Sequence, residues 1–224
     1  MPSKQKRVLV AGFDAFDKLD ANPSQTIVET LDASIMLPGG REQVQVDTVV
    51  LATCCIKAWA KLKRKMDANK GGYSAIILSG VAARREKISL ERFALNIRDY
   101  RIADNSGHQF EDSPVEKGGP AAMTSTLALK YMSKALTKKG VACEISNHAG
   151  TFICNEIYYK CLRYQEGKRS PASVLFVHLP LPKTYVKSVK AAKNKQASLA
   201  GKGKIEGISL MRSAIELIIK FSVV

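Results

Sequence analysis

The stretch AGTFICNEIY, residues 149–158, places Cys154 behind a small-residue turn and at the expected start of a helix. The first N–H groups of a helix have no partner within it, and the helix dipole favours an anion there. Both effects lower the pKa of a thiol and raise its thiolate fraction, as a cysteine nucleophile requires. The alternative is that Cys154 belongs to the core with Ile157, Cys161 and Leu162, because free cysteine is among the most buried residue types.

A cysteine nucleophile needs a base, and the chain contains three histidines. His178 ends the buried-strand pattern SVLFVHL, and catalytic groups of open α/β sheets collect at the carboxyl ends of strands. His148 ends the preceding strand pattern, close before Cys154, and competes for the same function, whereas His108 lies in the loop pattern DNSGHQF. A lone histidine is also often a core residue whose nitrogens are satisfied.

A carboxylate that orients the imidazole would complete such a site. Glu91 is the candidate, because apolar residues flank it in ISLERFALNI. The alternative for Glu91 is a simple ion pair with Arg92 or Arg98. Arg101, in YRIADN, is a candidate cation facing the site, although in a chain with 35 basic residues a single arginine is more often a surface residue.

Hydrophobic patterns predict the elements that must position these side chains. Continuous or alternating apolar runs predict strands at residues 7–13, 43–51, 73–80, 141–146 and 173–179. Amphipathic patterns predict helices at residues 22–31, 54–69, 121–139, 151–165 and 209–221. Strands and helices that alternate in this way indicate an α/β fold with a mainly parallel, twisted sheet and helices on both faces. No linker pattern divides the chain, so residues 1–224 are expected to form one domain.

Two segments are predicted to be loops. Residues 99–120 are rich in Asp, Asn, Gly and Pro, and residues 183–204 contain seven lysines without an acid, a composition that allows partial disorder. The net charge of +15 makes binding of RNA or another polyanion an alternative function. The lysine tract offers only Tyr185 for base stacking, and a solvated basic surface is the usual explanation, so nucleic-acid binding is the less favoured function.

Cysteine usage and the termini indicate the compartment. Five cysteines without C-x-x-C spacing predict neither a disulfide framework nor a structural zinc site. No apolar run approaches the roughly 18 residues that span a bilayer, and the first apolar run is too short for a signal peptide. We therefore expect a cytoplasmic protein with reduced thiols, with no membrane partner and no metal or organic cofactor.

Six motifs, taken together and in order, resemble those of the pyroglutamyl peptidase I family of cysteine peptidases. They are GFDAFDKLDANPS, ISLERFALN, RIADNSGHQ, KGGPAAMTSTLALK, AGTFICN and FVHLP, from Val8 to about Pro182. The resemblance implies an enzyme that removes an N-terminal pyroglutamyl residue from peptides through a thioester intermediate. It also implies a single three-layer α/β/α domain that commonly assembles as a tetramer, and a reaction that needs no cofactor.

The resemblance assigns functions residue by residue. At the matching positions, the nucleophile is Cys154, the base is His178 and the glutamate that orients the base is Glu91. An arginine beside the oxyanion corresponds to Arg101. Phe13 and Phe16 match the aromatic residues that hold the pyrrolidone ring.

The chain also departs from the family motifs. GFDAFDK replaces GFxPFGG, which places Ala15 at a proline and Asp17 and Lys18 at two glycines of the motif. GVAARR replaces GxAGGR, which places Ala83 and Arg84 at two glycines, and Val81 stands where some members carry a polar residue. These changes leave the catalytic residues in place but alter the surroundings of the pocket. A family member with lost or redirected peptidase activity is therefore a further alternative.

Overall fold

The central sheet is the frame of the molecule. The computed structural model describes residues 6–16, 21–185 and 203–223, and within them seven strands form one sheet in the order β2-β3-β1-β4-β9-β5-β8. These strands are β1 (Arg7–Phe13), β2 (Ser34–Met36), β3 (Gln43–Leu51), β4 (Ala75–Val81), β5 (Ile88–Glu91), β8 (Cys143–Ser146) and β9 (Ser173–Leu179). Strands β3, β1, β4 and β9 run parallel to one another, and β5 runs parallel to β8. Strand β2 is antiparallel to β3, and β5 is antiparallel to β9. The predicted mainly parallel sheet is confirmed.

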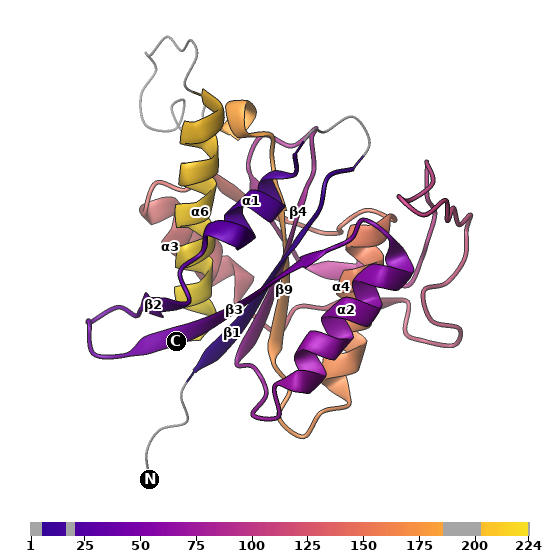
Figure 1. The fold of residues 1–224 in the computed structure, drawn as a ribbon, viewed down its shortest axis with the longest axis horizontal. Coiled ribbons are helices and arrows are strands. Elements are labelled where there is room, and N and C mark those ends of the chain that lie inside the picture. Colours follow the sequence, from indigo (N-terminus) through magenta and orange to yellow (C-terminus); the bar gives the residue numbers. More distant parts are fainter. Residues whose placement is uncertain (1–5, 17–20, 186–202, 224) are drawn as a thin grey trace.

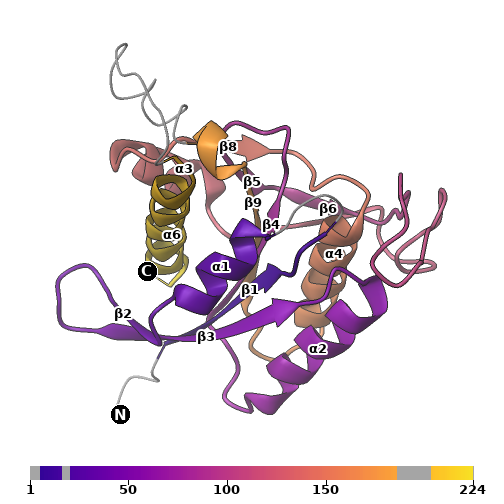
Figure 2. The ribbon, with the colours of Figure 1, turned by 45° about the horizontal axis from the view of Figure 1, so that its top comes forward.

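Helices cover both faces of this sheet. They are α1 (Pro23–Thr30), α2 (Cys55–Ala68), α3 (Leu129–Lys138), α4 (Ile153–Glu166) and α6 (Gly203–Ser222), and residues 182–185 are also helical. Helices α1, α3 and α6 lie on one side and α2 and α4 on the other (Figures 1 and 2). This arrangement confirms the predicted three-layer α/β/α fold.

Two hydrophobic cores follow from the alternation of side chains along each strand. In β1, Val8 and Val10 belong to the core beneath α1, α3 and α6, whereas Leu9 and Ala11 belong to the core beneath α2 and α4. All four side chains are fully buried. A strand covered on both faces needs apolar residues at every position, which is why its sequence reads as a continuous apolar run.

Three predicted elements need correction. The helix predicted for residues 121–139 begins only at Leu129, because residues 122–124 form strand β7 (Ala122–Thr124), which pairs with β6 (Phe93–Leu95) in a second, two-stranded sheet. The last helix begins at Gly203 instead of residue 209, with Glu206 in its first turn, where the helix dipole favours a negative charge. The loop predicted for residues 183–204 is therefore shorter at both ends, and its remainder, residues 186–202, lies outside the described residues.

Two features of the fold prepare the site. The carboxyl ends of the parallel strands β1, β3, β4 and β9 share one edge of the sheet, where α/β proteins bind their ligands. Residues 99–120 form the predicted irregular segment, apart from a single bridge of Ser113 to Arg98. Among the described helices, none combines the length and the apolar character needed to cross a membrane.

Candidate active site

His178 and Glu91 form a buried pair. His178 is the penultimate residue of β9 and is 4% exposed, and Glu91 ends the neighbouring strand β5 and is fully buried. Nδ1 of His178 lies 2.7 Å from Oε1 of Glu91. With Nδ1–H donating to the carboxylate, Nε2 is left as the basic nitrogen of the ring. The ring of Phe176, two residues earlier on the same strand, packs against the imidazole with 4.8 Å between ring centroids.

The two other histidines lie in different surroundings. His148 is exposed, and its Nδ1 accepts a hydrogen bond from the N–H of Gly150 in the turn before α4. His108 lies in the loop 99–120, where its Nδ1 is 3.2 Å from a carboxylate oxygen of Asp104. Of the three histidines, His178 is the one that the structure joins to Glu91.

Cys154 lies in the first turn of α4, the helix that packs against β9. A Cβ atom at Gly80 of β4 would be 3.1 Å from Sγ of Cys154, so the sulfur lies directly above the strand at that glycine. Gly80 is in turn the neighbour of His178 across the β4–β9 pair. No hydrogen bond joins Sγ to the imidazole within the part of the chain that the structure describes, and such contacts often tighten only when substrate binds.

The ionisation of Cys154 differs from the sequence-based prediction. The pKa of the thiol is raised to about 12, because burial disfavours the thiolate and the charge of Glu91 adds to the effect. A backbone hydrogen bond and the charge of Arg85 lower the pKa, but they are outweighed. Burial and the charge of Glu91 therefore outweigh the effect of the helix start, and the predicted lowering of the pKa is not found. The pKa of His178 is lowered, first by burial, against the hydrogen bond and the charge of Glu91.

These two shifts define the resting state of the pair. A thiol with a raised pKa and an imidazole with a lowered one are both neutral at neutral pH. The arrangement is suited to an imidazole that removes the thiol proton during attack, and less suited to a preformed thiolate–imidazolium pair.

Residues next to Cys154 on α4 fix the helix in place. The Asn155 side chain accepts a hydrogen bond from the N–H of Leu95 at 2.8 Å and donates one to the carbonyl of Leu95 at 2.9 Å, so it pairs with β6 like a further strand. The hydroxyl of Tyr158 donates to the carbonyl of Glu91 at 3.1 Å. Sequence reasoning missed both residues, although a buried asparagine beside the candidate nucleophile was a usable signal.

A cavity of about 80 Å³ opens beside the thiol. Its lining residues are Phe13, Phe16, Asn22, Thr53, Gly80, Val81, Phe152, Ile153 and Cys154. The ring of Phe16 packs against that of Phe152 with 5.2 Å between centroids, which gives the cavity an aromatic wall. The structure thus brings the predicted ring-binding residues, Phe13 and Phe16, to the same cavity as the candidate nucleophile.

The NPS part of the first motif holds the wall of this cavity. The Asn22 side chain caps α1 by accepting from the N–H of Ser24, and it donates to the carbonyl of Asp14 at 3.0 Å. The hydroxyl of Ser24 accepts from the N–H of Phe13 at 3.0 Å. A carboxylate oxygen of Asp14 accepts from the N–H of Thr53 at 2.6 Å. The end of β1, with Phe13, and the segment after it, with Phe16, are therefore fixed to α1 and to the end of β3.

The structure pairs Glu91 with an arginine that the sequence analysis did not single out. Arg101 is exposed, and within residues 6–16, 21–185 and 203–223 it makes no hydrogen bond or ion pair. Nη1 of Arg85 instead lies 2.8 Å from Oε1 of Glu91. Glu91 thus pairs with Arg85 and not with the two arginines considered as its partners from the sequence. Ala83 and Arg84, which replace family glycines, are exposed.

A second cluster of polar groups lies next to the site. Ligand-type atoms of Cys54, Asp104 and His108 come within 4.8 Å of one another, and these donor types suit a transition metal. The carboxylate of Asp104 also accepts hydrogen bonds from the N–H groups of Cys55 and Ser106, at 3.0 and 2.8 Å. Burial opposes ionisation of Asp104, but backbone hydrogen bonds hold its pKa well below the usual range. Asp104 therefore fixes the loop 99–120 to the start of α2, with or without a metal.

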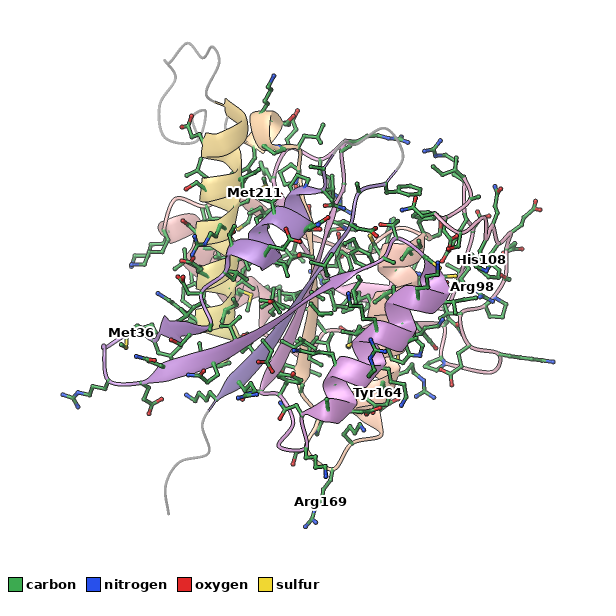
Figure 3. All side chains as sticks on the ribbon, viewed as in Figure 1. Met36, Arg98, His108, Tyr164, Arg169 and Met211 are labelled. Atoms are coloured by element: carbon green, nitrogen blue, oxygen red, sulfur yellow. The ribbon has the colours of Figure 1, made fainter. Side chains whose placement is uncertain are left out.

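A larger cavity lies at the opposite end of α4. It measures about 360 Å³ and is lined by polar residues that include Lys70, Tyr164, Lys168 and Arg169. Tyr164 and Arg169 lie far from His108 and its loop (Figure 3). The lining contains no cysteine and no histidine, whereas the smaller cavity is lined in part by Cys154.

Comparison with known proteins identifies the family. A family model described as pyroglutamyl peptidase matches residues 6–220. The pyrrolidone-carboxylate peptidase of Vibrio campbellii is 33% identical over 211 residues, 94% of this chain and 92% of that protein. The protein of the same name from Coprothermobacter proteolyticus is 30% identical over 95% of this chain and 96% of its own length.

Solved structures agree with these sequence matches. The crystal structure of Bacillus amyloliquefaciens pyroglutamyl peptidase I superposes with a TM-score of 0.81 at 26% identity, covering 98% of this chain and 97% of that one. The pyrrolidone carboxyl peptidase of Thermococcus litoralis also superposes with a TM-score of 0.81, at 30% identity over 98% of this chain and 94% of its own. The resemblance noted from the six motifs is confirmed, and the chain belongs to the pyroglutamyl peptidase family.

Proposed function

We propose that Cys154, His178 and Glu91 are the catalytic residues with which this pyroglutamyl peptidase removes an N-terminal pyroglutamyl residue from peptides. The observation that carries the proposal is the buried His178–Glu91 pair, with Nδ1 and Oε1 2.7 Å apart, beside a thiol that borders the aromatic cavity. A nucleophile, a base and a group that orients the base are the three components of nucleophilic acyl transfer.

The reaction begins with neutral His178. Nε2 takes the proton of Cys154 while the sulfur attacks the carbonyl carbon that joins pyroglutamate to the next residue. Glu91 stabilises the imidazolium that forms. The imidazolium then gives its proton to the leaving amine, and a thioester between pyroglutamate and Cys154 remains. Water, deprotonated by His178, attacks the thioester, and the returning proton restores the thiol as pyroglutamate leaves.

The oxyanion forms near the start of α4. The first N–H groups of a helix have no partner within it, and the side chain of Phe152, the N-cap residue, makes no capping hydrogen bond. Backbone donors of this kind typically contribute about 3 kcal/mol each to transition-state stabilisation. We place the oxyanion at these N–H groups and not beside Arg101, which is exposed.

The cavity accounts for the choice of substrate. A pyroglutamyl ring is a small uncharged lactam, which can stack on Phe13 and Phe16 and against Val81. The two polar side chains of the lining are already engaged, because Asn22 Nδ2 and Thr53 Oγ1 both donate to the carbonyl of Asp14. The N–H and C=O of the lactam are therefore expected to bond main-chain groups. A free N-terminal glutamate or glutamine should be rejected, because its charged amine would lie in an apolar cavity without a partner.

A fluorogenic assay tests the activity and the alternatives together. Release of a fluorophore from a pyroglutamyl amide is measured beside release from a prolyl amide, which has a ring of the same size without the lactam carbonyl. The peptidase should cleave the first and leave the second. Cleavage of neither would favour a family member whose altered loops have abolished the activity. The family relationship does not favour polyanion binding as the primary function, and the same assay with added RNA would show whether it modulates the enzyme.

Two further features are proposed from the resemblance. We expect the chain to assemble as a homotetramer and to act in the cytoplasm. Sedimentation equilibrium at several protein concentrations tests the first, and fractionation of cells that express the tagged chain tests the second. A monomer at all concentrations would contradict the tetramer.

A further inference from the structure

Arg85 makes a contact that the reaction outlined above does not use. It lies on the connection between β4 and β5, and its side chain is 23% exposed. Its Nη1 lies 2.8 Å from Oε1 of Glu91, the same oxygen that is 2.7 Å from Nδ1 of His178. The other oxygen of Glu91, Oε2, is buried and has no hydrogen-bond partner among the described residues. All the polar side-chain contacts of this carboxylate with the described residues therefore pass through one oxygen, which Arg85 and His178 share.

This sharing affects the charge on His178. A buried carboxylate needs a compensating charge, and without Arg85 a protonated His178 would be the only one in contact with it among the described residues. The guanidinium of Arg85 is always charged, so it compensates Glu91 whether or not His178 carries a proton. It also repels an imidazolium bound to the same oxygen. Among the described residues, the charged groups that act on His178 are Glu91 from β5 and Arg85 from the β4–β5 connection. The thiol of Cys154, from α4, lies over Gly80, the cross-strand neighbour of His178.

The directions of the pKa shifts agree with this account. The pKa of His178 is lowered first by burial and also by the charge of Arg85, whereas Glu91 raises it. The charge of Arg85 also lowers the pKa of Cys154, against burial and Glu91. Arg85 therefore favours both the free base and the loss of the thiol proton.

A second contact connects Arg85 to the approach of the nucleophile. Its Nη2 donates to the carbonyl of His148 at 3.3 Å, and the hydroxyl of Ser146 donates to the same carbonyl at 3.2 Å. The turn that follows contains Gly150, whose φ of +82° is a conformation that glycine adopts readily, and it leads into α4 and Cys154. The guanidinium of Arg85 thus contacts both the carboxylate of Glu91, which pairs with the base, and the segment that precedes Cys154 in the chain.

We propose that Arg85 is a positioning residue of this peptidase, which compensates the buried charge of Glu91 so that His178 remains unprotonated and able to act as the base at neutral pH. The inference rests on the proposed catalytic function of His178 and Glu91. This function differs from the one that the resemblance implies for Arg101, which is to lie beside the oxyanion.

The pH dependence of kcat/KM separates this function from a merely structural one. Loss of the cation in Arg85→Gln should move the acid limb to higher pH, so that the variant loses about tenfold more of its kcat/KM at pH 6 than at pH 8. Arg85→Lys keeps the charge and should keep the limb near its native position, although kcat can fall. Arg64→Gln, a change of an exposed arginine on α2, is the matched control and should leave both the limb and the rate unchanged.

A second measurement does not depend on activity. The substitutions His108→Gln and His148→Gln leave His178 as the only histidine, and its imidazole can be titrated by NMR with ¹³C-labelled histidine, both with Arg85 in place and after the further substitution Arg85→Gln. The titration should move to higher pH when the arginine is removed, even if the peptidase assay shows no activity. If Arg85→Gln does not fold, the same comparison is made between the native residue and Arg85→Met, which also lacks the charge.

The outcomes are distinct. The inference would be overturned if Arg85→Gln left both the acid limb of the kcat/KM profile and the titration of the His178 imidazole at their native pH, whatever happens to the rate. Equal shifts in Arg85→Gln and Arg85→Lys would also overturn it, because a change of packing and not of charge would then be responsible. An inactive native enzyme with the predicted NMR shift would refute the proposed function and leave the electrostatic function of Arg85 supported.

Discussion

Gly80→Ala tests whether the thiol of Cys154 lies on the sheet where the structure places it. The added methyl group would be 3.1 Å from Sγ of Cys154 and 3.1 Å from Cζ of Phe176. Ordinary contacts between such atoms are about 3.5 to 4.0 Å, so the sulfur must move by about 0.5 Å or the strand must shift. A misplacement of about 1 Å can cost a hundredfold in rate, so we expect kcat to fall by about tenfold. The methyl group also enters the cavity that Gly80 lines, so KM should rise.

The effect on folding should be small by comparison. Overpacking costs about 1 to 3 kcal/mol, and replacing glycine by alanine at a backbone that accepts it returns about 0.4 to 1 kcal/mol through the unfolded state. Kinetics with a fluorogenic pyroglutamyl amide and thermal unfolding are measured on the same preparations. Gly167→Ala, after the end of α4, is the matched control, because no atom lies within 4 Å of the added methyl group. Native kcat/KM in a folded Gly80→Ala would refute the placement of the sulfur over β4.

Further predictions concern the base, the cavity, the pH profile and the loop. His178→Ala should lower kcat by at least about a hundredfold while His148→Ala is mild, and the reverse ranking would exchange the two assignments. Phe16→Ala should cost roughly 1 to 3 kcal/mol in kcat/KM for the pyroglutamyl amide, and unchanged kinetics would show that the ring binds elsewhere. Because the pKa of His178 is lowered and that of Cys154 is raised to about 12, native kcat/KM should be level from about pH 7 to 9; a fall in this range would indicate a thiolate–imidazolium pair. Asp104→Asn should lower the free energy of unfolding at pH 7 by about 1 to 3 kcal/mol. Because the folded-state pKa of Asp104 is depressed, the stabilisation by its carboxylate is present above about pH 4 and is lost as the pH falls further. In denaturant titrations, the difference in unfolding free energy between the native chain and the variant should therefore be smaller at pH 3 than at pH 7.

The long elements of the fold could be predicted because burial on two faces leaves a simple pattern. β1 and β3 begin and end at the residues expected from their apolar runs, residues 7–13 and 43–51. The short strands β5 and β6 were missed, because their joint sequence, ISLERFAL, mixes charged and apolar residues. In addition, β5 runs antiparallel to β9, and β6 belongs to the separate two-stranded sheet. The full burial of Glu91 explains that mixture, since the carboxylate is paired inside the fold with His178 and Arg85.

The sequence could name the members of the candidate site but not their electrostatics. The motifs brought Cys154, His178, Phe13 and Phe16 into one hypothesis, and the structure places the thiol and both rings at one cavity, with His178 beside the strand position over which the sulfur lies. The sequence indicated that a helix begins near the thiol, but not that burial and the charge of Glu91 raise the pKa of this half-buried side chain. It also could not show which arginine reaches Glu91, because that depends on how the β4–β5 connection folds back over the sheet.

The central claim is that Cys154 is the nucleophile of a pyroglutamyl peptidase. The most direct test compares the native chain with Cys154→Ala for release of a fluorophore from a pyroglutamyl amide, at equal concentrations of folded protein. The native chain should hydrolyse the amide, and the variant should release fluorophore no faster than buffer alone. Hydrolysis by Cys154→Ala at a rate near the native one would contradict the account.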